Sequence, residues 1–235
     1  GLTEGVFQFE SAGMRRTIMR SRPKSIEDLT AVISLYRPGP MQFIDMYIEN
    51  KQHPERITYR HKRLSEILNV TFGCIIYQEQ VMPIFRELAG YSLGRADIVR
   101  RAMSKKKHDV LEKERRVFIH GLEDENGNVL IEGCVRRGVD ESIAATIFKE
   151  IESFASYAFN KSHAAAYAMV AYQTAYLKFY YPKEYLAALL SSVLGWAGKI
   201  AVYMEECHRL GIEVLPPHVN FSENDFTVSG GNIRY

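Results

Sequence analysis

The chain has 235 residues, of which 46% are apolar, and its 30 Lys and Arg against 28 Asp and Glu give a formal charge of +2. This length suits one large domain or two small ones, and the apolar share is ordinary for a packed globular core. No apolar run approaches the length of a membrane span, and no signal peptide is visible. We therefore expect no membrane partner, and the overall charge says little about other partners.

The three cysteines, Cys74, Cys134 and Cys207, are odd in number and far apart. Their spacing suggests neither a disulfide framework nor a zinc site, and the adjacent pair Cys207-His208 is a weak basis for a metal ligand set. We predict no metal site. Three free thiols fit a reducing cytosol, so we expect a cytoplasmic protein.

Helical patterns begin near Ser25, which precedes an apolar segment with acids in its first turn, and residues 38–40 (Pro-Gly-Pro) end that element. A second helix is predicted before Gly90 and a third after Asp140, a plausible N-cap. Their apolar stripes at helical spacing are Val81, Ile84, Phe85 and Leu88 for the second helix, and Ile143, Ile147, Ile151 and Phe154 for the third.

The last third of the chain predicts three consecutive helices. A long helix begins near Ser162 and runs to about residue 179. Pro182 then suits the first turn of a helix over residues 182–194. A further helix over residues 199–210 stops at Gly211.

Strand content is predicted to be low. Residues 73–77 form one short strand, 124–128 form a turn that suits a small hairpin, and 226–235 form a hairpin around residues 230–232. Pro216-Pro217 marks a change from helices to extended chain. We therefore predict a mainly α fold, with a helical domain over residues 1–215 and the extended or hairpin start of a following subdomain over 216–235.

A Lys, a Ser and a His lie together where the long helix begins, in residues 159–167 (FNKSHAAAY). The first turn of a helix has unpaired amide groups and the positive end of the helix dipole, and both favour a bound phosphate. Lys161 would add a full charge, and Ser162 suits the N-cap. A capped core helix with an exposed Lys explains the same residues equally well.

The most basic stretch runs over residues 95–116, where nine Lys or Arg face four acids, a local excess of +5. If residues 97–103 are helical, Asp97 and Arg101 are four apart and can support each other, while Arg100 points about 100° away. The three lysines at 105–107 follow as a dense cationic end. A solvated basic face is the alternative interpretation.

Four motifs closely resemble, in order and spacing, the fingers region of the bacterial DNA polymerase III alpha subunit, a C-family replicative polymerase. They are residues 5–14 (GVFQFESAGM), 35–41 (LYRPGPM), 77–82 (YQEQVM) and 96–107 (ADIVRRAMSKKK). The resemblance covers essentially the whole chain. Its departures are a local insertion at about 124–139 and mild variants at Phe9 and Ala158.

The resemblance implies phosphate contacts for the basic residues, and the start of the long helix adds further candidates. The predicted nucleotide-binding residues are Arg100, Arg101, Lys105, Lys106, Asn160, Lys161, Ser162, His163 and Tyr167. The predicted DNA-binding residues are Lys107, Gln78, Gln80 and Arg37. The glutamines and Arg37 could equally brace the basic helix, and Tyr167 could be a core residue. For Tyr172, Tyr176, Tyr180 and Tyr181 we expect core packing.

No Asp-x-Asp motif lies on a predicted strand, and alpha subunits carry their catalytic aspartates in a palm domain that precedes this region. We therefore interpret the chain as an excised piece, fingers without palm, which binds but does not polymerise. The implied partners are primer-template DNA, deoxynucleoside triphosphates and other subunits of the replicase holoenzyme, with Mg²⁺ held by the absent palm. A non-catalytic helical module that binds DNA or another polyanion, and a purely structural scaffold, are the competing classes.

Overall fold

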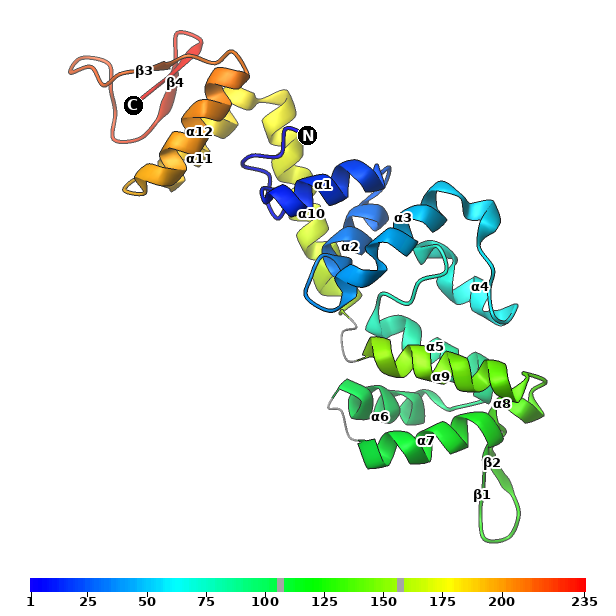
Figure 1. Ribbon diagram of the computed structural model, residues 1–235. Coiled ribbons are helices and arrows are strands. Elements are labelled where there is room, and N and C mark those ends of the chain that lie inside the picture. The colour runs from blue at the N-terminus through cyan, green and yellow to red at the C-terminus, as the bar shows by residue number, and fades with distance from the viewer. Residues whose placement is uncertain (105–107, 156–158) are drawn as a thin grey trace. The chain divides into compact units, whose positions relative to one another are not determined.

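The computed structural model describes residues 1–104, 108–155 and 159–235, and it confirms the predicted mainly α fold (Figure 1). The helices are α1 (Ala12–Ser21), α2 (Ile26–Leu35), α3 (Ile44–Gln52), α4 (Arg63–Leu68), α5 (Gln78–Ala89), α6 (Leu93–Ser104), α7 (His108–His120), α8 (Gly133–Arg136), α9 (Glu141–Ala155), α10 (Lys161–Tyr180), α11 (Pro182–Ser192) and α12 (Ala197–Arg209). The strands are β1 (Leu122–Glu123), β2 (Val129–Ile131), β3 (Val214–Leu215), β4 (Thr227–Ser229) and β5 (Asn232–Arg234). In the described parts of the chain, no helix is long and apolar enough to cross a bilayer.

The chain divides into two compact units. The larger unit comprises residues 23–165, and the smaller unit comprises residues 1–22 and 166–235. The predicted division at residue 216 does not coincide with this one, because β3 pairs with β5 and β4 packs on α11 within the smaller unit. The boundary at residue 216 remains a proposal for the parent protein.

The core of the larger unit lies between α5, α7 and α9. The predicted apolar stripe of α5 is fully buried, and Gly90 ends this helix with a left-handed φ of 77°. The ring of Phe85 on α5 lies 4.9 Å from that of Phe118 on α7 and 6.1 Å from that of Phe148 on α9. Each helix therefore contributes an aromatic ring to one shared cluster, which holds α5 against α7 and α9.

Local side-chain caps start two helices of the larger unit where the sequence predicts them. The Ser25 hydroxyl accepts from the N–H of Asp28 at the start of α2, and Asp140 accepts from the N–H of Ile143 at the start of α9. Asp28 also lies 3.0 Å from the ammonium group of Lys51 on α3. The start of α2 is thereby fixed to α3.

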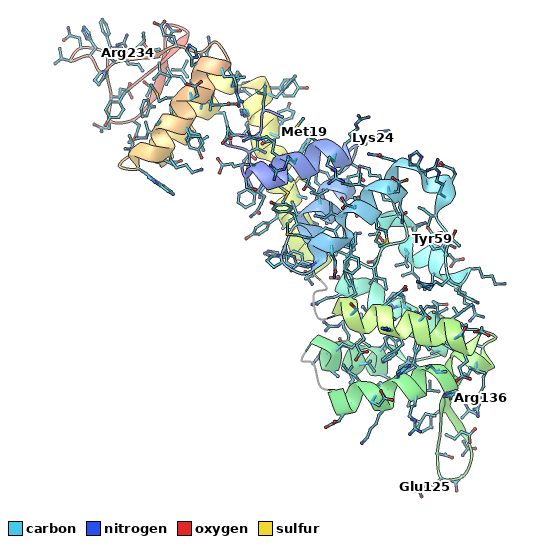
Figure 2. All side chains as sticks on the ribbon, in the orientation of Figure 1. Met19, Lys24, Tyr59, Glu125, Arg136 and Arg234 are labelled. Atoms are coloured by element: carbon cyan, nitrogen blue, oxygen red, sulfur yellow. The ribbon has the colours of Figure 1, made fainter. Side chains whose placement is uncertain are left out.

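The predicted hairpin around residues 124–128 is confirmed by β1 and β2, which pair antiparallel, and Glu125 lies at its tip (Figure 2). The predicted strand at 73–77 is wrong, because among the described residues the segment makes a single isolated parallel bridge, between Tyr77 and Phe159. The side-chain carbonyl of Gln80 accepts from the N–H groups of Ile76 and Tyr77, at 2.8 and 2.9 Å. These donors are consequently unavailable to a neighbouring strand.

The smaller unit contains α11, α12 and a three-stranded sheet in the order β3-β5-β4. The predicted hairpin of β4 and β5 is confirmed, and α10, α11 and α12 begin and end within two residues of their predicted bounds. The parallel pairing of β3 with β5 was not predicted. Ile233 of β5 is fully buried with Leu186 and Leu190 of α11, so the sheet closes this small core.

The amino-terminal segment of the smaller unit is held by α10 and α12. The ammonium group of Lys178 donates to the carbonyls of Leu2 and Glu4, at 3.1 and 2.7 Å, and pairs with the buried Glu206. The carboxylate of Glu10 accepts from Tyr203. Polar contacts therefore fix the segment that carries the first motif.

The core packing expected for four tyrosines of this unit is wrong. Tyr172, Tyr176, Tyr180 and Tyr181 are 44–59% exposed. Successive ring centroids of Tyr172, Tyr176 and Tyr180, which we call the tyrosine ladder, lie 6.2 and 4.5 Å apart. Residues one turn apart lie on the same face of a helix, so the ladder forms an aromatic stripe along α10.

Candidate functional site

The amino-terminal ends of α5 and α10 lie side by side in the larger unit. The N–H of Gln78 donates to the carbonyl of Phe159 at 3.0 Å, and the N–H of Phe159 donates to the carbonyl of Ile76 at 3.4 Å. Each chain segment then continues directly into its helix. Because the bridge is parallel, both helices present their unpaired amides and positive dipole ends to the same region.

The N-cap of α10 is Asn160. Its side-chain oxygen accepts from the N–H of His163 at 2.9 Å, and its backbone carbonyl accepts from Ala164. The prediction that Ser162 caps the helix is therefore wrong, and Ser162 lies exposed in the first turn. Asn and Ser are comparable N-cap residues, so the sequence alone did not separate the two positions.

A carboxylate from the start of α5 occupies the start of α10. The two oxygens of Glu79 accept from the N–H of Lys161 at 3.0 and 3.1 Å, and one of them also accepts from the side-chain amide of Asn160 at 3.0 Å. Glu79 lies in the first turn of α5. It thus holds donors that the sequence suggested for phosphate, and its pairing across 82 residues was not predicted.

Among the described residues of the larger unit, Glu27 and Tyr77 lie near the ammonium group of Lys161. It lies 3.0 Å from the carboxylate of Glu27 on α2 and 5.4 Å from the ring centroid of Tyr77. Lys161 is half-buried and Glu27 is more exposed, so the ion pair borders solvent. Tyr77 is buried, its hydroxyl has no partner in the described parts of the chain, and burial raises its pKa.

Phe159 brings two predicted site residues together. The guanidinium group of Arg37 lies 4.0 Å from the Phe159 ring centroid, a cation–π contact, and the imidazole of His163 meets the same ring edge-on at 5.3 Å. Arg37 also donates to the carbonyl of Ser34 at 3.0 Å, and burial lowers the pKa of Arg37. Arg37 therefore lies beside the start of α10.

The basic helix α6 is connected to α5 by Arg100. The guanidinium group of Arg100 donates to the side chain of Gln78 at 3.1 Å and to Asp97 at 2.7 and 3.0 Å. Arg101 pairs with the other oxygen of Asp97 at 2.8 Å, as predicted, and is 69% exposed. Hydrogen bonding to Arg100 lowers the pKa of Asp97 despite some desolvation. Lys105, Lys106 and Lys107 lie outside the described residues.

Two predicted site residues, Gln80 and Tyr167, have partners within the chain. Gln80 is only 6% exposed, and its amide donates to the hydroxyl of Thr71 at 2.7 Å, a bracing contact, while its predicted DNA contact stays a prediction. Tyr167 belongs to the smaller unit, where its ring lies 5.2 Å from that of Phe7. Core packing, the alternative considered for Tyr167, describes this contact.

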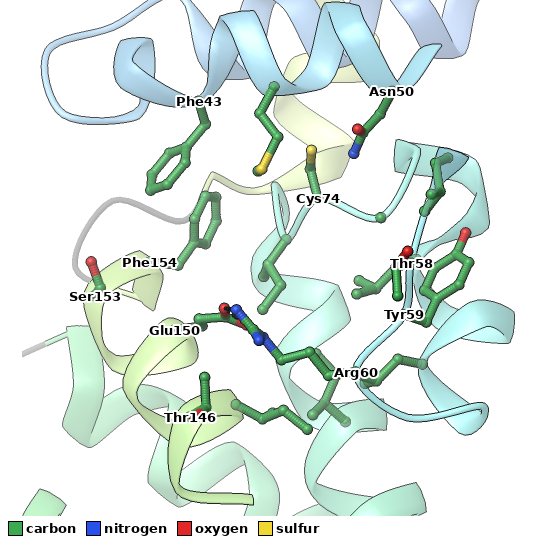
Figure 3. Close-up of a pocket in the computed structure, with 18 of the residues that line it drawn as sticks. Phe43, Asn50, Thr58, Tyr59, Arg60, Cys74, Thr146, Glu150, Ser153 and Phe154 are labelled. Atoms are coloured by element: carbon green, nitrogen blue, oxygen red, sulfur yellow. Dashed lines mark hydrogen bonds and ion pairs between the residues drawn. The ribbon is translucent and has the colours of Figure 1, made fainter. Parts of the chain in front are cut away.

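A separate cavity of about 790 Å³ lies in the larger unit (Figure 3). Its wall is mainly apolar, with Phe43 and Phe154 facing each other and the Arg60–Glu150 ion pair beside them. Burial raises the pKa of the Cys74 thiol in its wall to about 12, so this thiol stays neutral. None of the predicted phosphate-binding residues that the structure describes lines the cavity, and the sequence did not indicate it.

The starts of α5 and α10 meet beside Lys161, Arg37 and Arg100, and helix starts with cations nearby are typical of sites that bind anions. Within the described ranges, no three or more His, Cys, Asp and Glu residues gather so as to hold a metal ion. The family model of the bacterial DNA polymerase III alpha subunit finger domain matches residues 1–126 of this chain. The chain belongs to this family, which confirms the resemblance found in the sequence.

Relatives match the chain along its whole length. It is 45% identical over 235 residues to the DNA polymerase III subunit alpha of Borreliella burgdorferi and to that of Bacillus subtilis, and 46% identical to that of Treponema pallidum. Each alignment covers all of this chain but only 19–20% of the relative. The chain thus spans about a fifth of the length of these DNA polymerase subunits.

Proposed function

We propose that the chain is the part of a DNA-directed DNA polymerase that holds the triphosphate of the incoming deoxynucleotide during template-directed synthesis. The observation that carries this proposal is the meeting of the α5 and α10 amino-terminal ends beside Lys161, Arg37 and Arg100. Membership of the finger-domain family favours a polymerase over a non-catalytic polyanion-binding module.

The proposed chemistry is nucleotidyl transfer in the parent enzyme. The primer 3′-oxygen forms a bond to the α-phosphorus of the nucleotide, the bond from that phosphorus to the bridging oxygen breaks, and pyrophosphate leaves. Backbone amides at the start of α10 and the charge of Lys161 would hold the β- and γ-phosphates. Arg100 and Arg101 would add planar, bidentate donors, which neutralise the charge on the leaving pyrophosphate.

The donor set of this region fits phosphate and does not fit Mg²⁺. Mg²⁺ prefers carboxylate oxygens and water, whereas the described groups that converge here are mainly N–H donors and cations, and their acids are already paired. We therefore assign the Mg²⁺ of the parent enzyme to residues outside this chain.

Primer-template DNA is the proposed second partner, through Lys107, Gln78 and Arg37. Lys105 and Lys106 would extend the phosphate contacts of α6. Other subunits of the replicase holoenzyme would be reached through the parent chain. A polymerase that copies a bacterial chromosome acts in the cytoplasm, so we place the parent enzyme there.

Alanine substitutions in the parent polymerase test the nucleotide assignment. Each of Lys161→Ala, Arg100→Ala and Arg101→Ala removes charge-assisted bonds of about 1.5–3 kcal/mol. We therefore expect the nucleotide KM to rise, or turnover to fall, by roughly ten- to 150-fold, since about 1.4 kcal/mol is a factor of ten. Affinity for primer-template DNA should change less.

The matched control is Lys149→Ala, which removes an exposed cation from α9 in the same unit. Its nucleotide kinetics should equal those of the unmodified enzyme. Unchanged nucleotide kinetics in all three site variants would refute the proposed function.

A further inference from the structure

We propose that Glu79 sets the nucleotide affinity of the polymerase: its carboxylate occupies the phosphate-binding donors at the start of α10 and must be displaced by the incoming triphosphate. Glu27 has the same role for the side chain of Lys161. This inference rests on the proposed function, because it concerns the residues assigned there to the triphosphate.

At the start of α10, the donors proposed for phosphate are already bonded to carboxylates. The N–H of Lys161 and the side-chain amide of Asn160 both donate to Glu79, and the ammonium group of Lys161 lies 3.0 Å from Glu27. A phosphate oxygen would compete for the same N–H. Two carboxylate charges at this position would also repel a triphosphate. Binding therefore requires an exchange of anions.

Glu79 has a second favourable position within reach of its own backbone. It belongs to the first turn of α5, where the helix dipole also favours a carboxylate. A rotation of the side chain away from α10 consequently leaves the charge beside the α5 amides. Glu79 can thus yield its α10 contacts to a phosphate without becoming a buried, unpaired charge.

The pair formed by Glu27 and Lys161 is weaker than the contacts of Glu79. Glu27 is 54% exposed and Lys161 is 34% exposed, and ion pairs that border solvent contribute little to stability. The ammonium group also has three donors, so it can turn toward a phosphate when Glu27 leaves.

Two displaced carboxylates predict a preference for polyphosphates. A ligand with one phosphate group can replace only one of them, whereas a triphosphate presents several anionic groups and can replace both. The carboxylates would therefore lower affinity in general while they favour nucleoside triphosphates over monophosphates.

The test uses the parent polymerase with saturating primer-template and compares Glu79→Gln, Glu27→Gln and the double variant. Glutamine keeps the size of the side chain but removes its charge. We expect the nucleotide KM to fall about three- to tenfold for Glu79→Gln. The effect is modest because phosphate exchanges one charge-assisted contact of the α10 donors for another, so that no such contact is simply lost. The fall should be smaller for Glu27→Gln and largest for the double variant.

Inorganic tripolyphosphate serves as a probe of the phosphate donors. Its inhibition constant should fall by the same factor as the nucleotide KM, because the effect concerns phosphate and not the base or sugar. Glu66→Gln, an exposed acid on α4, is the matched control and should change neither value. The Tm of each variant reports any loss of structure.

The outcomes separate this inference from the proposed function. If Lys161→Ala raises the nucleotide KM while Glu79→Gln leaves it unchanged or raises it, Glu79 is only a structural cap and the inference is overturned. If Lys161→Ala, Arg100→Ala and Arg101→Ala all leave the nucleotide KM and turnover unchanged, the proposed function itself fails. Should Glu79→Gln prevent folding, Glu79→Asp, which shortens the reach to α10, replaces it, and an unchanged KM there overturns the inference.

Discussion

Phe159 shows how one apolar residue can position several charged ones. Its backbone makes the bridge to Tyr77, and its ring lies between the guanidinium group of Arg37 and the imidazole of His163. The ring therefore brings a cation from the loop after α2 to the first turn of α10.

Gln80 has a comparable role from within α5, since its buried amide satisfies two backbone N–H groups that precede the helix.

We predict that His163 helps the parent polymerase to separate deoxyribonucleotides from ribonucleotides. His163 is exposed in the first turn of α10, two positions after Lys161. If Lys161 holds phosphate, the imidazole would face the sugar and crowd a 2′-hydroxyl. In His163→Ala, the ratio of deoxyribonucleotide to ribonucleotide incorporation should fall by roughly tenfold, the value of one contact of about 1.4 kcal/mol.

Ser162→Ala is the control for this measurement, because Ser162 is exposed and adjacent but lacks a bulky ring. Its discrimination ratio should stay unchanged. A His163→Ala enzyme that loses activity at a constant ratio would show that His163 only positions Phe159 or the helix start.

At the scale of elements, the sequence predicted those helices whose signals are local. Apolar stripes, the Ser25 and Asp140 caps and the stops at Gly90 and Gly211 each act within a few residues of their own helix. The strand β3 has only two residues and depends on β5, which lies almost 20 positions further along the chain. No periodicity in so short a segment could predict that pairing.

The sequence predicted the cations of the candidate site but not the residues that pair with them. Lys161 and Arg100 stood out by charge and by their place in motifs, and spacing on one helix indicated the contact of Asp97 with Arg101. The contact of Glu79 with Lys161 joins two helices far apart in sequence, and nothing in the spacing of residues within either helix encodes it.

The junction of α2 with α3 gives a stability prediction. Burial raises the pKa of Asp28, but the N–H of Lys24 and the ammonium group of Lys51 outweigh this effect, so the pKa is lowered overall. The pair is largely shielded from solvent. We expect Asp28→Asn to lower the free energy of unfolding by about 3 kcal/mol at pH 7, because it removes the carboxylate charge from an ion pair that is shielded from solvent.

The same junction fixes the sign of the pH dependence. A lowered pKa in the folded state means that the stabilisation is complete above the pKa of the unfolded chain, about 3.9 for Asp, and is lost as the pH falls through the folded value. Urea unfolding should therefore separate Asp28→Asn from the unmodified chain at pH 7 and bring them together in strong acid. The exposed Asp225→Asn is the control, and a difference that persists in acid would contradict the assignment.

At the scale of the whole molecule, the chain is about a fifth of its polymerase relatives, and we predict that alone it does not extend a primer. The reason is chemical: two-metal phosphoryl transfer needs carboxylates that hold the ions, and the described residues gather no such cluster. Primer extension with Mg²⁺ and all four deoxynucleotides is the measurement, with the parent enzyme as positive control. Template-dependent extension by the pure chain would contradict the prediction.

The tyrosine ladder on α10 has a consequence for the handling of the purified chain. Phe179 beside it is 76% exposed, and a contiguous aromatic surface of this kind promotes contacts between copies. A formal charge of +2 supplies little repulsion to oppose them. We expect this aromatic surface of α10 to control how readily copies of the chain associate in solution. Ammonium sulfate should precipitate the chain at modest concentrations, and tyrosine-to-serine changes along the ladder should raise the salt concentration that precipitation needs.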